Sequence, residues 1–242
     1  MPGLREWPAW AATRARWYST LERAPRLYCA YLRERGVGTV VDARTTIVID
    51  GSPGSANSFA REALLYSNPD AQVASHIHSA AHILEALRLG KPTVLTIRDP
   101  VDAISSYLAR GYRDELDDAL RAYARLHRRV LPVLDRVVVA PFDRVTQAFG
   151  AIVDEVDARF DTRLVAFPHD DPAARDAVFA TLEAYTRGVA GERATQLQAT
   201  PTAERRALSA DVRALLLEPG HEALIRDCET LYAQCLAHAS RQ

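Results

Sequence analysis

The chain has 242 residues, 48% of them hydrophobic and 25% charged, with a net charge of −1. A chain of this length can bury a large core, and its balanced charge gives no field that would hold it to nucleic acid or to an anionic membrane. It has no apolar run of about twenty residues, as a membrane span needs, and its start lacks the apolar stretch of a signal peptide. We therefore expect a globular, cytoplasmic protein with no membrane span and no nucleic-acid partner. The sequence leaves a homodimer open.

The N-terminal segment from Glu6 to Arg35 carries aromatic residues and leucines among arginines, at loosely helical spacing broken at Pro25. This pattern predicts one or two amphipathic helices, and such an aromatic stripe signals packing more often than a ligand surface. No linker, repeat or low-complexity tract divides the chain. We therefore expect a single domain over residues 1–242, with residues 1–40 as a helical extension packed on it.

Strands alternate with helices from Thr45 onward. The β-branched and apolar runs predict strands at residues 45–50, 72–76, 92–97 and 136–140. Helical periodicity predicts helices at residues 55–66, 79–89, from 101, from 114, and at 142–160, then at 171–185, 201–217 and 221–237. This alternation predicts an α/β fold of three layers, P-loop-like, with a mostly parallel sheet and helices on both faces. The C-terminal helices are expected to cap the sheet.

The segment between the first predicted strand and its helix runs from Gly51 to Ser58 and is rich in glycine and serine. In a parallel sheet phosphate commonly binds here, because glycines let the backbone approach an oxyanion and the next helix presents unpaired N–H groups. Ser55, Asn57 and Ser58 would add side-chain donors. An ordinary turn with Ser55 as the helix N-cap explains the segment equally well. No lysine follows a second glycine, which disfavours a standard ATP or GTP loop.

A second polar segment follows the third predicted strand. Arg98 leaves the end of that strand and offers a planar guanidinium to a phosphate, and Ser106 lies eight residues later, two turns into the next predicted helix. Asp99 as N-cap and Pro100 at the helix start would fix the turn between them. Arg98 could instead pair with Asp99 or Asp102. The order of strand, Arg-Asp-Pro, helix and serine favours the phosphate site.

Two histidines, His76 and His78, stand at the end of the second predicted strand. Alternation along an extended segment would place both on one side and Ile77 on the other. A neutral imidazole suits a general base because its unperturbed pKa is about 6.5. A His-x-His pair can also bind a metal, but no third ligand is evident and the three cysteines lack metal spacing. We therefore expect a base rather than a metal site, and reduced, buried cysteines.

The loop after the first strand resembles the donor loop of the sulfotransferases that use 3′-phosphoadenosine 5′-phosphosulfate, P-[KR]-S-G-[TN]-[TS]. The matching residues are Pro53, Ser55, Asn57 and Ser58. Gly54 departs from the pattern, because the family has a lysine or arginine there that contacts the bridging oxygen. The resemblance implies a cofactor-binding loop made of Gly51, Pro53, Gly54, Ser55, Ala56, Asn57 and Ser58.

The segment from Arg98 to Ser106 resembles the motif that binds the 3′-phosphate in the same family, R-[ND]-P-x-D-x-x-x-S, with the same spacing. In that family a histidine about 22 residues before the arginine accepts the proton of the acceptor hydroxyl. His76 stands 22 residues before Arg98. The resemblance thus implies His76 as the catalytic base, with His78 as the runner-up.

A weaker likeness lies near the C-terminus. The segment Thr186–Gly191 is similar to the family's late [RK]-G-x-x-G segment, which implies that Arg187 and Gly188 also hold the 3′-phosphate. Two glycines after a helix are more often its C-cap. Residues 199–237 also look like the C-terminal helices of bacterial sulfotransferase-like proteins, and the whole resemblance covers roughly residues 45–237, unevenly.

The resemblance implies in-line transfer of a sulfuryl group to a hydroxyl or amine of a small-molecule acceptor, with adenosine 3′,5′-bisphosphate as the product and no metal. Such a transfer depends mainly on positioning and charge stabilisation. Gly54 removes a cation at the leaving oxygen, for which Arg61, Arg110 or Arg113 would have to substitute. The alternatives are a catalytically inert nucleotide-binding protein and a small-molecule kinase with an atypical loop.

Overall fold

The structure, a computed structural model, describes residues 20–36, 39–110, 115–190 and 202–241. Its centre is a four-stranded parallel sheet in the order β2-β1-β3-β4. The strands are β1 (Ile47–Gly51), β2 (Val73–Ser75), β3 (Thr93–Ile97) and β4 (Val138–Pro141). All but the last strand residue are buried, as expected of a parallel sheet covered on both faces.

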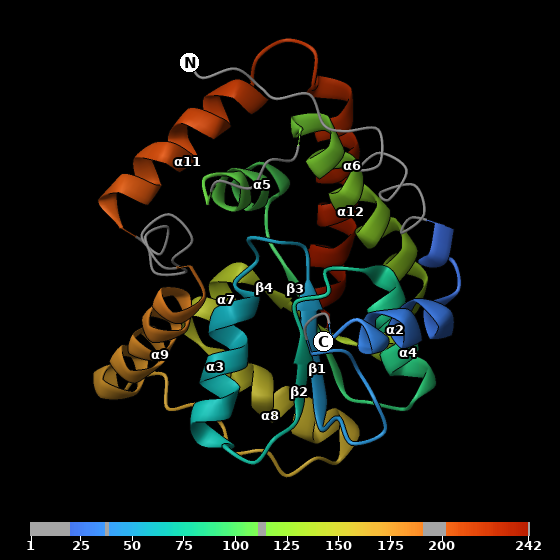
Figure 1. The fold of residues 1–242 in the computed structure, drawn as a ribbon, viewed down its shortest axis with the longest axis vertical. Helices are drawn as coiled ribbons and strands as arrows, with labels where there is room; N and C mark the ends of the chain where they lie inside the picture. Colours follow the sequence, from blue (N-terminus) through green and yellow to red (C-terminus); the bar gives the residue numbers. More distant parts are fainter. Residues whose placement is uncertain (1–19, 37–38, 111–114, 191–201, 242) are drawn as a thin grey trace.

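Helices surround this sheet. They are α2 (Pro25–Glu34), α3 (Asn57–Ser67), α4 (Ala80–Arg88), α5 (Pro100–Leu108), α6 (Leu116–Val130), α7 (Phe142–Gln147), α8 (Phe149–Phe160), α9 (Pro172–Ala190), α11 (Ala203–Leu216) and α12 (Glu222–Ala239), with a short 3-10 helix at Leu131–Arg136. They cover both faces of the sheet, which makes a three-layer α/β fold (Figure 1).

Alternate strand residues supply the two halves of the core. Ile47 and Ile49 of β1 pack in one apolar cluster with α3, α8 and α9, whereas Val48 packs in another with α2 and α4. On this second face α4, α6 and α12 also cover β3 and β4. The predicted α/β fold is therefore confirmed within the described residues.

One predicted helix is two helices in the structure. The expected helix at residues 142–160 is broken at Ala148, which has the non-helical dihedrals φ −152° and ψ 43°. No proline or glycine marks this break, so the sequence gives no local signal for it. At the C-terminus, α12 covers β3 and β4 beside α6, while α11 packs on α5.

The N-terminal extension is described from residue 20. Pro25 begins α2 rather than breaking a helix, as its fixed φ allows at the first helical position. Tyr28 and Leu32 then pack α2 on α4. The buried, free cysteines are Cys29, Cys228 and Cys235. Within the part of the chain that the structure describes, we find no helix with the length and apolar character that crossing a membrane requires.

Candidate functional site

The two predicted phosphate motifs meet at the carboxyl ends of β1 and β3. The chain goes from β1 outward to β2 and then returns past β1 to form β3, so the strand order reverses between β1 and β3. Open parallel sheets bind ligands beyond the carboxyl ends of their strands at such a reversal. The loop from Gly51 to Ser58 follows β1, and Arg98 follows β3.

The loop between β1 and α3 folds against the backbone of α5. Gly54 has φ +82° and Ala56 has φ +65°, both in the left-handed region. A Cβ atom at Gly54 would lie 2.2 Å from the carbonyl oxygen of Ala103. A side chain therefore fits at Gly54 only if the loop or α5 moves, and the lysine or arginine of the family pattern is excluded both by backbone conformation and by packing.

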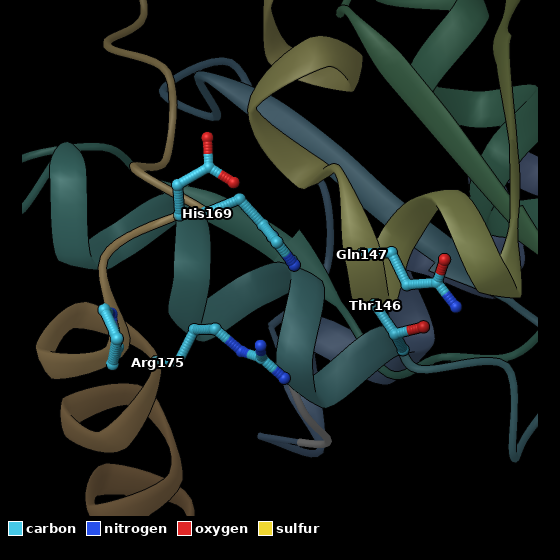
Figure 2. Close-up of a pocket in the computed structure, with 6 residues that line it drawn as sticks. Thr146, Gln147, His169 and Arg175 are labelled. Atoms are coloured by element: carbon cyan, nitrogen blue, oxygen red, sulfur yellow. The ribbon is translucent and has the colours of Figure 1, made fainter.

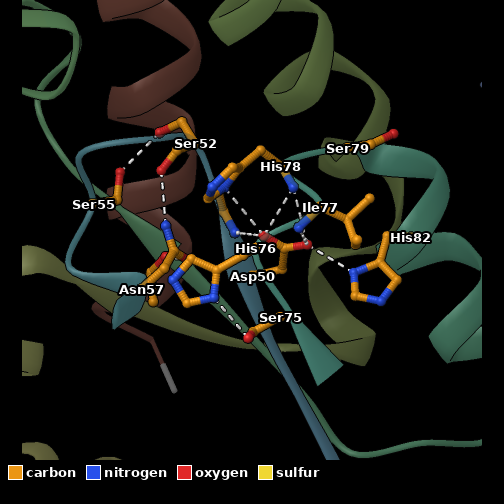
Figure 3. A network of polar contacts seen from close by, with 12 residues as sticks. Asp50, Ser52, Ser55, Asn57, Ser75, His76, Ile77, His78, Ser79 and His82 are labelled. Atoms are coloured by element: carbon orange, nitrogen blue, oxygen red, sulfur yellow. Dashed lines mark hydrogen bonds and ion pairs between the residues drawn. The ribbon is translucent and has the colours of Figure 1, made fainter. Parts of the chain in front are cut away.

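Several polar side chains of the loop are used inside the protein (Figure 3). The hydroxyl oxygens of Ser52 and Ser55 lie 2.8 Å apart. Asn57 donates to the carbonyl oxygen of Ser52 and accepts from Thr96 Oγ1 at 2.7 Å. The N-cap position of α3 belongs to Ala56, not to Ser55. The side chains of Ser55 and Asn57 thus help to hold the shape of the loop, and their role as donors to a ligand stays a prediction.

The first turn of α3 keeps its backbone donors. Among the described residues, the N–H groups of Asn57, Ser58 and Phe59 donate no hydrogen bond, and no side chain caps the helix. Unpaired N–H groups at a helix N-terminus carry partial positive charge and bind anions. The loop therefore offers an anion backbone donors. Pro53, which has no N–H, is half-buried between β1 and this turn.

Arg98 reaches the loop from β3. Its Nη1 donates to the carbonyl oxygen of Gly54 at 3.1 Å, and its Cζ lies 3.9 Å from the centroid of the Phe142 ring. Burial lowers the pKa of Arg98, which nonetheless stays charged at neutral pH. The contact joins residues 44 positions apart and places a cation at the loop, where the glycine carries none.

The carboxylates beside Arg98 in the sequence have other partners. Asp99 is the N-cap of α5 and accepts from the N–H of Asp102, and Pro100 is the first residue of that helix, as predicted. Asp102 pairs with Arg213. In the described part of the chain Arg98 forms no ion pair with a carboxylate, so the alternative in which Asp99 or Asp102 neutralises it is not supported.

Ser106 lies in α5, half-buried, and its hydroxyl group makes no hydrogen bond to a described residue. Its carbonyl oxygen accepts from Nη2 of Arg205 at 3.4 Å. Arg205 comes from α11 and is only 7% exposed. Burial, with the positive charges of Arg110 and Arg98, lowers its pKa to about 10. No pattern in the sequence predicts that Arg205 lies beside Ser106, because nothing in the sequence shows that α11 packs on α5.

Positive charge gathers around this end of the sheet. Arg110 acts on the pKa of Arg205 and also on that of His76. Arg61 acts on His76 as well, but it forms an ion pair with its neighbour Glu62. Both of these arginines, considered as substitutes for a cation at the loop, act on His76, and Arg61 has the larger effect.

The late segment is described only as far as the end of α9. Arg187 is exposed in the last turns of α9, and Gly188 lies within the same helix rather than in a C-cap. No hydrogen bond or ion pair joins Arg187 to a residue that the structure describes. Gly191 and Arg113 lie outside the described residues. The predicted role of Arg187 and Gly188 stays a prediction.

The two histidines sit in a tight turn rather than in an extended segment. β2 ends at Ser75, and His76 and His78 have φ +62° and +53°. Such values are strained for residues other than glycine and persist only where the surroundings fix them. The two rings are still neighbours, with centroids 5.8 Å apart, and Ile77 packs away from them on the cluster of α2 and α4.

A buried carboxylate fixes this turn. Asp50, fully buried at the end of β1, accepts from the backbone N–H groups of Ile77 and His78, each at 3.2 Å, and from that of Gly51 (Figure 3). Its other partner is the ring of His82. Burial alone would raise the pKa of Asp50, but the hydrogen bonds from His78 and His82 outweigh this effect and hold the pKa far below its usual range.

The hydrogen-bond partners of His82 and His78 determine which ring nitrogen of each carries the proton. Nε2 of His82 accepts from the N–H of Val41 at 3.0 Å, so Nδ1 carries the proton that is donated to Asp50. His78 donates from Nδ1 to the carbonyl oxygen of Gly51 at 2.8 Å. Its Nε2 is left as an acceptor, and among the described residues it has no hydrogen-bond partner.

His76 contacts the loop from Gly51 to Ser58 directly. Its Nε2 lies 2.9 Å from the hydroxyl oxygen of Ser58, and its Nδ1 lies 2.8 Å from that of Ser75. Although the residue is exposed, desolvation of the ring and the nearby His78 lower its pKa to about 4. His76 is therefore neutral at pH 7, as a general base must be.

Comparison with models of protein families gives no match, and comparison with curated proteins gives no significant match. The likeness to sulfotransferases thus rests on the motifs alone.

Proposed function

We propose that this protein binds 3′-phosphoadenosine 5′-phosphosulfate at the loop from Gly51 to Ser58 and transfers its sulfuryl group to a hydroxyl or amine of a small molecule. The observation that carries the proposal is Arg98. It is half-buried, touches the loop at Gly54 and forms no ion pair with a carboxylate among the described residues, although Asp102, Asp99 and Asp143 act on it from a greater distance. A partly desolvated cation of this kind is best satisfied by an anion at the loop.

The site offers separate places for two phosphate groups. The N–H groups of the first turn of α3 would bind the 5′-phosphate and the sulfuryl oxygens. Arg98 and the unused hydroxyl of Ser106 would bind the 3′-phosphate. Arg205, in contact with the backbone of Ser106, adds charge at the second place. This division supports a nucleotide with phosphates at both ends of its ribose.

In the proposed reaction the acceptor oxygen or nitrogen attacks sulfur, and the bond from sulfur to the bridging oxygen of the 5′-phosphate breaks. The proton of the acceptor goes to a histidine, and adenosine 3′,5′-bisphosphate leaves. Nε2 of His78 is open to receive this proton. Nε2 of His76 becomes open once the hydroxyl of Ser58 turns toward the donor. A positioned base contributes about 10² to 10⁴ in rate.

Charge on the leaving oxygen needs a cation other than a side chain at Gly54. Arg98 is the cation that contacts Gly54, and Arg110 lies close enough to act on His76. Electrostatic stabilisation of this kind contributes about 3 kcal/mol or more to the barrier. Because Arg98 is assigned to the 3′-phosphate, we assign charge stabilisation at the leaving oxygen to the N–H groups of the first turn of α3 and to Arg110.

Calorimetric titration with adenosine 3′,5′-bisphosphate tests the proposal. We expect saturable binding that Arg98→Ala weakens by about tenfold to a hundredfold, the effect of one charge-assisted pair. Arg121→Ala is the matched control, because Arg121 is exposed on α6 and pairs only within its own helix. Absence of binding, or equal affinity in Arg98→Ala, would contradict the proposal.

Transfer is tested separately from binding. The protein is incubated with sulfur-labelled donor and a mixture of phenols, alcohols and amines, and the label is followed by chromatography. Labelled acceptor supports the enzyme. Binding without transfer or donor hydrolysis would instead identify an inert nucleotide-binding protein, and stabilisation by ATP with magnesium but not by adenosine 3′,5′-bisphosphate would identify a kinase.

A further inference from the structure

A cavity of about 350 Å³ is lined by the end of α7, the segment before α9 and the first turns of α9 (Figure 2). Its lining residues are Thr146, Gln147, His169, Asp170, Pro172 and Arg175. None of them belongs to the proposed nucleotide site. A cavity of this size is in the range of small-molecule sites.

Two opposite charges line this cavity without neutralising each other. Arg175 on α9 and Asp170 just before it form no ion pair with one another or with any other residue that the structure describes. The side-chain amide of Gln147 also makes no hydrogen bond within the described residues. Figure 2 shows Arg175 and His169 directed toward the space that faces Thr146 and Gln147.

His169 adds an unsatisfied ring nitrogen. Its Nε2 is buried with no hydrogen-bond partner, whereas Nδ1 lies 3.4 Å from the backbone nitrogen of Phe149. Burial and the charge of Arg175 lower the pKa of His169, so the ring is neutral at pH 7, although the Thr146 carbonyl and Asp170 oppose this shift. A buried ring nitrogen without a partner is unfavourable, and a polar ligand group would relieve it.

The ring of His169 is held in place by aromatic neighbours. Its centroid lies 6.3 Å from that of Phe59 on α3 and 5.8 Å from that of Phe167, both in edge contacts. A donor fixed by packing loses little freedom when a ligand binds. The cavity therefore has a fixed imidazole, a cation and an anion around one space.

We propose that this cavity binds a small zwitterion of the amino-acid class. The ligand carboxylate accepts from Arg175 and from Nε2 of His169, and the ligand ammonium group meets Asp170. An anion without an amine is disfavoured, because Asp170 repels it, and a cation without a carboxylate is disfavoured by Arg175. Gln147 contacts the ligand side chain or its carboxylate. The inference does not depend on the proposed nucleotide function.

The test is a titration of the full chain with the proteinogenic amino acids, one at a time, followed by the ¹⁵N signals of the His169 ring. We expect at least one amino acid to shift these signals in a saturable way. The corresponding acid without the amine, and the amine without the carboxylate, should each bind at least about tenfold more weakly, as expected for one lost charge pair. Arg175→Gln and Asp170→Asn should weaken binding by a similar factor.

Arg163→Gln and Asp176→Asn are the matched controls, because both residues are exposed in or beside the same segment and do not line the cavity. They should leave the affinity unchanged. The proposal is overturned if no amino acid shifts the His169 signals, or if the acid or the amine alone binds as tightly as the parent. Arg98→Ala should not change this binding, so the outcome is separate from that of the nucleotide experiments.

Discussion

Nδ1 of His82 lies 2.7 Å from Oδ2 of Asp50, and both side chains are fully buried at the carboxyl end of β1. This pair joins α4 to β1, while the same carboxylate accepts from the N–H groups of Ile77 and His78. The buried carboxylate of Asp50 thus fixes the strained turn on which His76 lies. Asp50 and His82 are positioning residues, because neither is exposed to a ligand.

Replacement of Asp50 by asparagine tests this role. The amide keeps one acceptor oxygen, so in either orientation its NH₂ group faces N–H donors, either those of Ile77 and the His82 ring or that of Gly51. Removal of one partner from a buried pair costs about 3 to 5 kcal/mol. We expect a loss of this size in the free energy of unfolding, measured with urea.

Asp118→Asn is the control for Asp50→Asn, because the side chain of Asp118 is 70% exposed and pairs only with Arg121. It should change the free energy of unfolding by less than about 0.5 kcal/mol. A loss below about 1 kcal/mol in Asp50→Asn would show that the turn at His76 does not depend on this carboxylate.

Gly54 gives a second test, since its φ is +82° and its Cβ position is occupied by the carbonyl oxygen of Ala103. Gly90 has a similar φ of +67° but open space around it, so Gly90→Ala measures the backbone cost alone. We expect that cost to be about 1 kcal/mol. Gly54→Ala should lose about 2 kcal/mol more, because overpacking adds to the strain.

Gly54→Lys restores the side chain of the sulfotransferase pattern and should still not improve transfer. The lysine can be accommodated only if the loop moves away from α5, which would separate Gly54 from Arg98. We expect weaker binding of adenosine 3′,5′-bisphosphate and a lower melting temperature. A stable Gly54→Lys protein with faster transfer would show that the loop adapts and that the missing cation limits the reaction.

We expect replacement of Arg205 and replacement of Arg187 to affect nucleotide binding differently. Arg205 contacts the backbone of Ser106, whereas Arg187 is exposed on α9. Arg205→Met, which fills a similar volume without charge, should weaken the binding of adenosine 3′,5′-bisphosphate by about tenfold or more. Arg187→Met should have less than a twofold effect, within about 0.4 kcal/mol. Melting temperatures of both variants, measured without ligand, separate loss of binding from loss of folding. If Arg187→Met weakens binding more than Arg205→Met does, the late segment rather than Arg205 contributes to the nucleotide site.

The catalytic base is distinguished by transfer rates at saturating donor. Glutamine at His78 removes the open Nε2, and glutamine at His76 removes the ring beside Ser58. Loss of the base should lower kcat by about 10² to 10⁴ while leaving nucleotide affinity nearly unchanged. If neither variant loses more than a fewfold in kcat, the reaction uses no histidine of this turn.

The sequence predicts well those features that depend on residues close together in the chain. The strand at 93–97 is a continuous β-branched or apolar run, and the strand at 47–51 begins with one, at residues 47–49. The helix start at Asp99 and Pro100 follows from capping and from the fixed φ of proline. Parallel topology then requires that the segments after neighbouring strands meet, which is why the loop and Arg98 are found together.

The features that the sequence hides depend on packing between distant segments. Asp50 reads as the last residue of a strand and His82 as part of an amphipathic helix, and only the fold brings them together across 32 residues. Asn57 looks like a ligand donor until Thr96 and Ser52 take up its amide. Gly54 looks like the loss of a catalytic cation, but its neighbour Ala103 shows a steric cause.

His127 predicts how stability depends on pH. It is fully buried in α6, donates from Nδ1 to the carbonyl oxygen of Tyr123, and leaves Nε2 without a partner. Burial lowers its pKa to about 4, despite the opposing effect of the Tyr123 carbonyl. The unfolded chain, with a histidine pKa of about 6.5, takes up this proton as the pH falls, whereas the folded chain does not.

Above pH 6.5 the ring is neutral in both states and contributes no pH dependence. Between pH 6.5 and 4 the folded protein should lose about 3 kcal/mol through this residue, and the loss levels off below the folded pKa. His127→Asn keeps a donor for the Tyr123 carbonyl but cannot titrate. It should be less stable at pH 7, because it leaves a cavity, and it should show a flatter decline toward pH 4 in urea unfolding. Parallel pH profiles for the two proteins would exclude His127 as the source of acid sensitivity.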